Sequence, residues 1–334
     1  MSMAAILIFA HCKPRPHDGS ATIGLSSDEG TWYTLPPSGL TAVPTTIVDR
    51  ATPLLKAHVR ALFRQLPPAL AGDEEAIHQM RVAGRRLRVV LPLLARRPSG
   101  RRVRRGRRIL RELTRSAGTS RDLDVGVALF EERLRERAEM DAERRTLRQR
   151  LRSARSRSRV RMAEALMDID IARVRRDLRV VVSRRAELVF TALLRLRDAR
   201  DVRGTAILES LDALGDGFDA AALHRLRIRL RRLRYAAELA EKLTGQTSEA
   251  PALFRQLQDA LGHVRDAHVL SCWMGRQAAA AAARGQTSLA AAAREEEAFF
   301  LERSHEHHRS FLALSPAATV RRGLEAMGAS RTAA

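Results

Sequence analysis

Apolar residues recur at every third or fourth position along most of the chain, which is the spacing of an amphipathic helix. The pattern begins near Val48 and continues almost to the C-terminus. Alternating strand patterns are absent, and aromatic residues make up 4% of the chain. The breaks in the pattern contain glycine or proline and fall at Pro67-Pro68, Pro98 to Gly100, Gly204, Gly215 to Gly217, Gly245 to Pro251 and Gly285. The pattern therefore predicts an all-α protein.

The two ends of the chain differ from this helical region. Residues 1–45 are rich in Gly, Ser, Thr and Pro and lack helical periodicity, so we expect a disordered N-terminal extension. The apolar run from Met3 to Ala10 is too short to span a bilayer, and no basic residue precedes it as in a signal peptide. Residues 316–334 are interpreted as a C-terminal tail. Because no uninterrupted transmembrane stretch is found elsewhere in the sequence, we expect no membrane partner. Cys12 and Cys272 are the only cysteines, which predicts no disulfide framework and a cytoplasmic location.

One motif occurs twice. After His78, arginines follow at three, seven, eight and ten residues, and the same spacing follows His224. Further on, Gly118-x-x-Arg-Asp is repeated as Gly262-x-x-Arg-Asp. The shared order and near-equal separation predict a tandem duplication, with a first repeat at about 46–198 and a second at about 199–315. The predicted architecture is two pseudo-symmetric helical bundles with a central basic groove.

Each copy of the motif places its basic and apolar residues on different sides of a helix. With about 100° per residue, the arginines fall within roughly one quadrant beside the histidine. We call these sets the arginine ridges: His78, Arg81, Arg85 and Arg88 in the first copy, and His224, Arg227, Arg231 and Arg234 in the second. The opposite sides carry Met80, Leu87, Leu91 and Leu94, and Leu226, Leu230 and Leu233.

The excess of positive charge in the chain indicates what the ridges bind. The sequence has 60 Lys+Arg against 38 Asp+Glu, a net charge of +22, and only three of the basic residues are lysine. Codon bias also favours arginine over lysine, but it does not produce the excess of positive charge. An ordinary solvated face mixes both signs, whereas these ridges place like charges three and four residues apart, where they repel. Because the guanidinium fork matches phosphate oxygens, the ridges predict a bound polyanion.

Other residues are candidates for the same site. Arg111 and Arg255 occupy equivalent repeat positions and are candidates for a second wall, and Arg121 is expected to reach the groove. Gly118 and Gly262 are expected to end helices. The aspartates four residues later are interpreted as N-caps or as ion-pair partners that position an arginine.

The histidines are not predicted to hold a metal. A ridge histidine among arginines suits a hydrogen bond to phosphate better than a divalent metal or catalysis. In the run from His305 to His308, the side chains do not share one helix face, so we expect a surface histidine run.

With these motifs, residues 46–315 resemble the CHAD family, the conserved-histidine α-helical domain. The resemblance rests on the repeated His-x-x-Arg-[Val/Ile]-x-x-Arg-Arg-Leu-Arg element and on Arg121 to Val125 and Leu257 to Gly262. It implies two bundles related by a pseudo-twofold, with both ridges facing a central basic cavity. It also implies binding of inorganic polyphosphate by the ridge residues and association with polyphosphate granules.

Two other functions are compatible with a strongly basic chain. Non-specific nucleic-acid binding is expected at this charge, but base readout or stacking would favour Asn, Gln or aromatic residues near the arginines. A phosphoryl-hydrolysing enzyme needs carboxylates that hold a metal beside the phosphates, and the ridges contain none. The sequence therefore predicts a binding protein without catalytic activity and without a cofactor.

Overall fold

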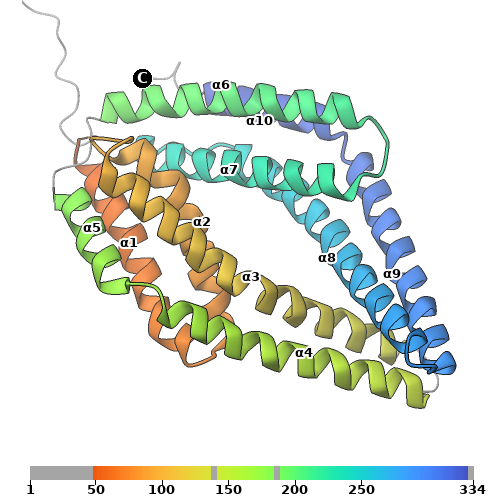
Figure 1. Cartoon of the computed structure of the whole chain (residues 1–334). Coiled ribbons are helices and arrows are strands. Elements are labelled where there is room, and N and C mark those ends of the chain that lie inside the picture. The colour runs from red at the N-terminus through yellow and green to blue at the C-terminus, as the bar shows by residue number, and fades with distance from the viewer. Residues whose placement is uncertain (1–47, 137–140, 184–188, 330–334) are drawn as a thin grey trace, which may run out of the picture. The chain divides into compact units, whose positions relative to one another are not determined.

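The computed structural model describes residues 48–136, 141–183 and 189–329, and their regular secondary structure is entirely helical (Figure 1). These residues belong to one structural unit, 44–334. The described helices are α1 (Val48–Leu70), α2 (Glu74–Leu94), α3 (Arg101–Arg135), α4 (Ala142–Met167), α5 (Ile171–Ser183), α6 (Val189–Leu214), α7 (Ala220–Thr244), α8 (Ala250–Ala282), α9 (Thr287–Ala313) and α10 (Pro316–Ala329). The all-α prediction is confirmed. The extension predicted for residues 1–45 lies outside the described residues.

Most of the predicted breaks separate helices, and local side chains explain where the helices begin. Asp73 caps α2 by accepting a 2.6 Å hydrogen bond from the backbone N–H of Ala76. Asp219 caps α7 in the same way through Ala221 and Ala222. Gly245 ends α7 with a φ of 79°, a left-handed conformation that glycine adopts without strain.

Two of the predicted breaks and the predicted C-terminal tail were wrong. Pro67 and Pro68 lie inside the last turn of α1, so the helix ends slightly later than predicted. Gly204 lies within α6, where a Cβ would be 2.7 Å from a side-chain carbon of Leu324. This glycine allows α10 to approach α6 and does not end the helix. Residues 316–329, interpreted from the sequence as a tail, form α10, which buries Val320 completely.

Gly118 and Gly262 do not end helices either, so the capping prediction is wrong. Helices α3 and α8 continue through them without interruption. The guanidinium of Arg81 donates to the carbonyl oxygens of Ala117 and Gly118, at 2.5 and 2.9 Å. At Gly262, a Cβ would be 3.4 Å from the guanidinium of Arg227. The absence of a side chain at Gly262 thus leaves room for Arg227 of the preceding helix, whereas a Cβ at Gly118 would meet no atom within 4 Å.

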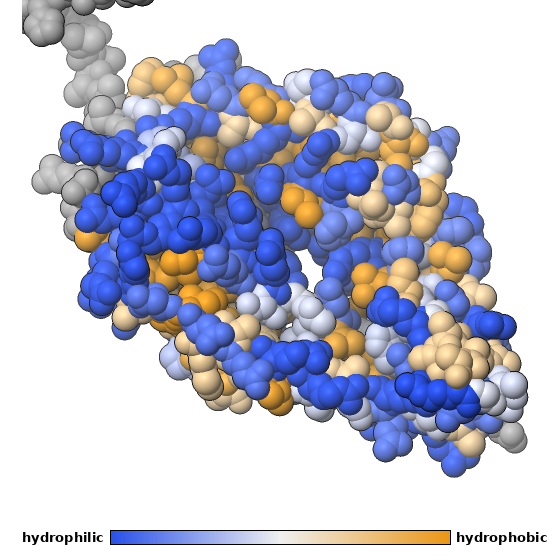
Figure 2. Space-filling model, viewed as in Figure 1, coloured by the Kyte–Doolittle hydropathy of each residue, from blue (hydrophilic) through white to orange (hydrophobic). Residues whose placement is uncertain are grey.

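Four helices contact one another in a closed order: α2 packs on α3, α3 on α8, α8 on α7 and α7 on α2. The molecular surface in Figure 2 is hollowed near its centre, and hydrophilic residues border the hollow. In this order of contacts, the two helices that carry the arginine ridges, α2 and α7, touch each other directly. Each predicted repeat packs its helices in the same sequence, α1 to α4 and α6 to α9. The pseudo-twofold axis stays a prediction.

The buried apolar residues form three clusters. The first joins α1, α2, α5 and the first half of α3 with parts of α4, α6 and α7, and the third joins α6 to α10. The second lies where the far ends of α3, α4, α8 and α9 meet, around Phe130 and Phe300. The apolar sides predicted for the two ridge helices are buried, with Leu87 and Leu230 fully inaccessible. Among the described helices, none combines the length and apolar character needed to cross a bilayer.

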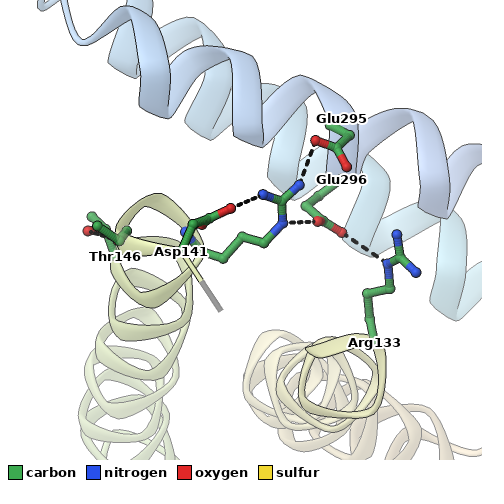
Figure 3. Close-up of polar contacts among 7 residues, drawn as sticks. Arg133, Asp141, Thr146, Glu295 and Glu296 are labelled. Atoms are coloured by element: carbon green, nitrogen blue, oxygen red, sulfur yellow. Dashed lines mark hydrogen bonds and ion pairs between the residues drawn. The ribbon is translucent and has the colours of Figure 1, made fainter. Parts of the chain in front are cut away.

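A buried ionic network accompanies the second cluster (Figure 3). Arg144 of α4 is 4% exposed and Glu296 of α9 is 0% exposed, and they share a 2.6 Å charge-assisted hydrogen bond. Arg144 also pairs with Glu295 and Asp141, while Glu296 contacts Arg133 of α3 at 3.6 Å. Burial alone would lower the pKa of Arg144, but these carboxylates outweigh it and raise that pKa. The network connects α3, α4 and α9, and its residues are far from the ridge residues in the sequence.

Candidate anion-binding site

The contact between α2 and α7 brings arginines of both ridges into one electrostatic environment. Burial and the charges of Arg85 and Arg227 lower the pKa of Arg231 to about 9. Burial, followed by charges that include Arg227 and Arg265, likewise lowers the pKa of Arg85. A guanidinium lowers the pKa of another only when both are close and poorly screened. The structure therefore places Arg85, Arg227 and Arg231 near one another, and that they face one ligand stays a prediction.

Arg265 of α8 connects this group to α3. Its guanidinium donates to Asp122 at 2.6 Å and to Asp266 at 3.0 Å. The ion-pair interpretation of the two aspartates is thereby confirmed for these contacts. Arg265 was not among the predicted site residues, although its position equivalent to Arg121 in the repeat could have identified it.

The ridge histidines lie at the edge of the same group. Burial, and then the charge of Arg121, lowers the pKa of His78. Burial, and then the charge of Arg265, lowers the pKa of His224. His224 and Arg265 also line a pocket of about 370 Å³ between α7 and α8. Both imidazoles are therefore held mainly neutral near pH 7 and can accept a proton when an anion arrives.

Three predicted site residues are in contact with oxygen atoms of the protein itself. Arg81 is 6% exposed and binds the α3 carbonyl oxygens described above. Arg234 is 9% exposed and donates to Gln258 at 3.1 Å and to Glu238 at 3.0 Å. Arg255 is solvent-exposed and lies 3.9 Å from Glu238. The guanidinium groups of Arg81 and Arg234 thus serve the packing of the ridge helices, which the helical wheel cannot show.

A second group of arginines lies further along α2. Burial, and then the charges of Arg111 and Arg232, lowers the pKa of Arg88 to about 10. Burial, and then the charges of the same two neighbours, also lowers the pKa of Arg107. Burial, and then the charges of Arg232 and Arg107, lowers the pKa of Arg203. Arg88 and Arg111 were predicted, whereas Arg107, Arg203 and Arg232 were missed. The dense basic run 101–115 was the available signal for Arg107, but its density alone does not distinguish a site from a solvated face.

The histidines of α9 are not all on the surface. His308 is 4% exposed and packs against Phe218, with ring centroids 5.5 Å apart. His305 contacts the same ring at 4.3 Å. The prediction of a surface run was therefore wrong for His308, because Phe218 from the α6–α7 connection covers it. Within the described ranges, no group of three or more His, Cys, Asp or Glu side chains is arranged to hold a metal ion.

The comparisons with known proteins show the family and the fold. The sequence model of the CHAD domain matches residues 53–275. The chain belongs to the CHAD family. The crystal structure of the CHAD domain from the plant Ricinus communis is similar at 23% identity and a TM-score of 0.57, covering 84% of this chain and 92% of that one. PptA from Streptomyces chartreusis is similar at 19% identity and a TM-score of 0.58, with coverage of 80% and 99%. At these identities the likeness shows that the CHAD fold is shared; no curated protein matches the chain.

From the lowered pKa values of the two histidines we expect anion binding to depend on pH. A bound polyanion stabilises protonated His78 and His224, so binding takes up protons. Affinity for long-chain polyphosphate should therefore increase as the pH falls from 7.5 towards 5, through the region below the ordinary histidine pKa. Each histidine contributes up to about tenfold if its pKa rises by about one unit.

Isothermal titration at several pH values measures this dependence. In the variant His78→Gln with His224→Gln, the profile should be nearly flat. An unchanged profile would mean that neither imidazole takes up a proton on binding.

Proposed function

We propose that this CHAD domain binds inorganic polyphosphate through the arginines of α2 and α7. The observation that carries the proposal is the crowding of Arg85, Arg227 and Arg231, each with a pKa lowered by burial, with neighbouring arginines lowering each further. Such crowding destabilises the unliganded protein, and a polyanion relieves it. The association of the CHAD family with polyphosphate supports this choice of ligand.

A linear polymer suits the spacing of the basic groups. Arg81, Arg85 and Arg88 lie within seven residues of one helix, a rise of about 10 Å along its axis. One polyphosphate chain can therefore contact the group around Arg85 and the group around Arg88 together. Because each neutralised phosphate releases a counterion, affinity should increase with chain length and decrease with salt. We propose further that this binding brings the protein to polyphosphate granules, which co-localisation of the tagged chain with granules tests.

Competition between polyanions tests the ligand class. At physiological salt, long-chain polyphosphate should displace duplex DNA and RNA at lower phosphate concentration than either nucleic acid displaces polyphosphate. The reason is that a flexible inorganic chain can follow closely spaced arginines, whereas the nucleic-acid backbone carries its phosphates further apart. Fluorescence anisotropy with labelled polyphosphate and labelled duplex measures both directions. Equal competition by all three polymers would favour non-specific nucleic-acid binding.

We propose that the domain binds without hydrolysing its ligand. Arginine and imidazole neutralise phosphate oxygens, but phosphoryl transfer normally needs a carboxylate-held metal beside them. Asp122 and Asp266 are paired with Arg265, and Glu238 is paired with Arg86 and Arg234. Polyphosphate with Mg²⁺ or Mn²⁺ should therefore release no phosphate above background, while the melting temperature rises through ligand binding to the folded state. Steady phosphate release that is lost in His78→Ala or His224→Ala would support an enzyme instead.

A further inference from the structure

A second pocket lies on the side of α3 and α8 that faces α4. It has a volume of about 440 Å³ and is lined by residues of these three helices. Its lining includes Leu151, Leu270 and Trp273, which are 1%, 2% and 9% exposed and belong to the second apolar cluster. An apolar interior containing an indole ring suits a planar, weakly hydrated group.

The same pocket is bordered by arginines. Arg157 and Arg161 of α4 and Arg276 of α8 line it, and all three are exposed. In the described part of the chain, none of the three forms an ion pair or hydrogen bond. Asp122 is the acidic residue of the lining, and its carboxylate is already paired with Arg265. The border therefore offers three available guanidinium groups to an anion.

We infer that this pocket binds a nucleotide, with the base against Trp273 and the phosphates at Arg157, Arg161 and Arg276. Stacking of a base on an aromatic ring tolerates any base, because every base has a π face. Arginine binds phosphate oxygens through paired donors. Both chemistries meet here within one pocket, and a nucleoside triphosphate is the simplest ligand that uses both.

Inorganic polyphosphate does not account for this pocket. It has no apolar part, so it gains nothing from the indole ring and the leucines. The arginine ridges, in contrast, contribute charge without such a lining. The pocket shares none of its lining residues with the ridges, so nucleotide binding here and polyphosphate binding at the ridges can be tested independently.

The tryptophan content of the chain allows a direct test. Trp32 and Trp273 are the only tryptophans, so Trp32→Phe leaves Trp273 as the sole indole reporter. ATP should change its emission saturably. Inorganic tripolyphosphate should require about tenfold or more higher concentration, and adenosine should give no saturable change, because each supplies only half of the interaction. The full-length chain is used throughout.

Variants of the lining separate the two halves of the interaction. Arg157→Glu with Arg161→Glu should weaken ATP binding by about tenfold or more, since two phosphate contacts become repulsive. Ala154→Phe should block the pocket without changing its charge, because Ala154 lines it. The ridge variant Arg85→Glu with Arg231→Glu should leave the ATP response of Trp273 unchanged. Circular dichroism confirms that each variant is folded.

Each contrary result overturns the inference. No emission change with ATP means that the pocket does not bind nucleotides. Equal potency of tripolyphosphate means a simple anion site. Loss of the response only in the ridge variant means that ATP binds at the ridges and that Trp273 reports it indirectly.

Discussion

Replacing Arg85 and Arg231 together by glutamate should weaken binding of long-chain polyphosphate by about a hundredfold or more at moderate salt. These residues come from different ridges, yet Arg85 is among the charges that lower the pKa of Arg231. Reversing both charges therefore places two carboxylates in the region where the phosphates are proposed to lie. Fluorescence anisotropy or isothermal titration measures the loss.

The same variant should not lose stability through electrostatics. Both substitutions remove repulsion among neighbouring arginines, so the melting temperature without ligand should stay the same or rise. Arg81 is a poorer choice for this test, because a carboxylate there would face the carbonyl oxygens of Ala117 and Gly118. Its replacement would confuse loss of binding with loss of packing.

A matched control changes the same amount of charge elsewhere. Arg284→Glu with Arg294→Glu alters two exposed arginines near the α8–α9 connection. It should reduce polyphosphate affinity only slightly, through the net charge. If both double variants weakened binding equally, the effect would come from total charge, and the assignment of the ridges as the binding site would be wrong.

Replacing Arg144 by methionine should cost about 3–5 kcal/mol in the free energy of unfolding. The substitution leaves Glu296, which is fully buried, without its closest cationic partner (Figure 3). Arg133 remains near Glu296 but contacts it at 3.6 Å, against 2.6 Å for Arg144. Chemical denaturation monitored by circular dichroism measures the change.

Removing both charges separates the desolvation effect from packing. Arg144→Met with Glu296→Leu should recover about 2 kcal/mol or more of the loss, because no unpaired buried carboxylate remains. As a control, Arg309→Met breaks an ion pair with Glu302 whose side chains are 64% and 60% exposed, and should cost at most about 1 kcal/mol. If Arg144→Met cost as little as Arg309→Met, the ion pair of Arg144 with Glu296 would not be what stabilises this part of the fold.

The helices could be predicted from local pattern, and the same pattern is the source of the anionic ligand proposed here. Helical periodicity depends only on neighbours along the chain, so the apolar sides of α2 and α7 were identified correctly. The repeat added long-range information, because two copies of a motif imply similar surroundings. It pointed to Arg85, Arg227 and Arg231 as parts of one site.

Positions decided by contact between distant helices could not be predicted in this way. Gly204 and Gly262 have the sequence character of helix ends, yet each lies inside a helix where a side chain of another element approaches the backbone. A glycine that allows close approach and one that ends a helix are the same residue in a sequence. Only the neighbouring side chains, Leu324 at Gly204 and Arg227 at Gly262, distinguish the two cases.

The sequence by itself determined that this chain is helical, strongly basic and twice provided with a His/Arg ridge, because these properties follow from composition and local spacing. The tertiary structure alone decided which arginines face one another and which are used by the fold. Arg81 and Arg85 lie four residues apart on one predicted ridge, but Arg81 binds α3 carbonyl oxygens while Arg85 lies near Arg227 and Arg231. The difference arises from the helices packed beside them, since a helical wheel gives a direction and only packing supplies the partner.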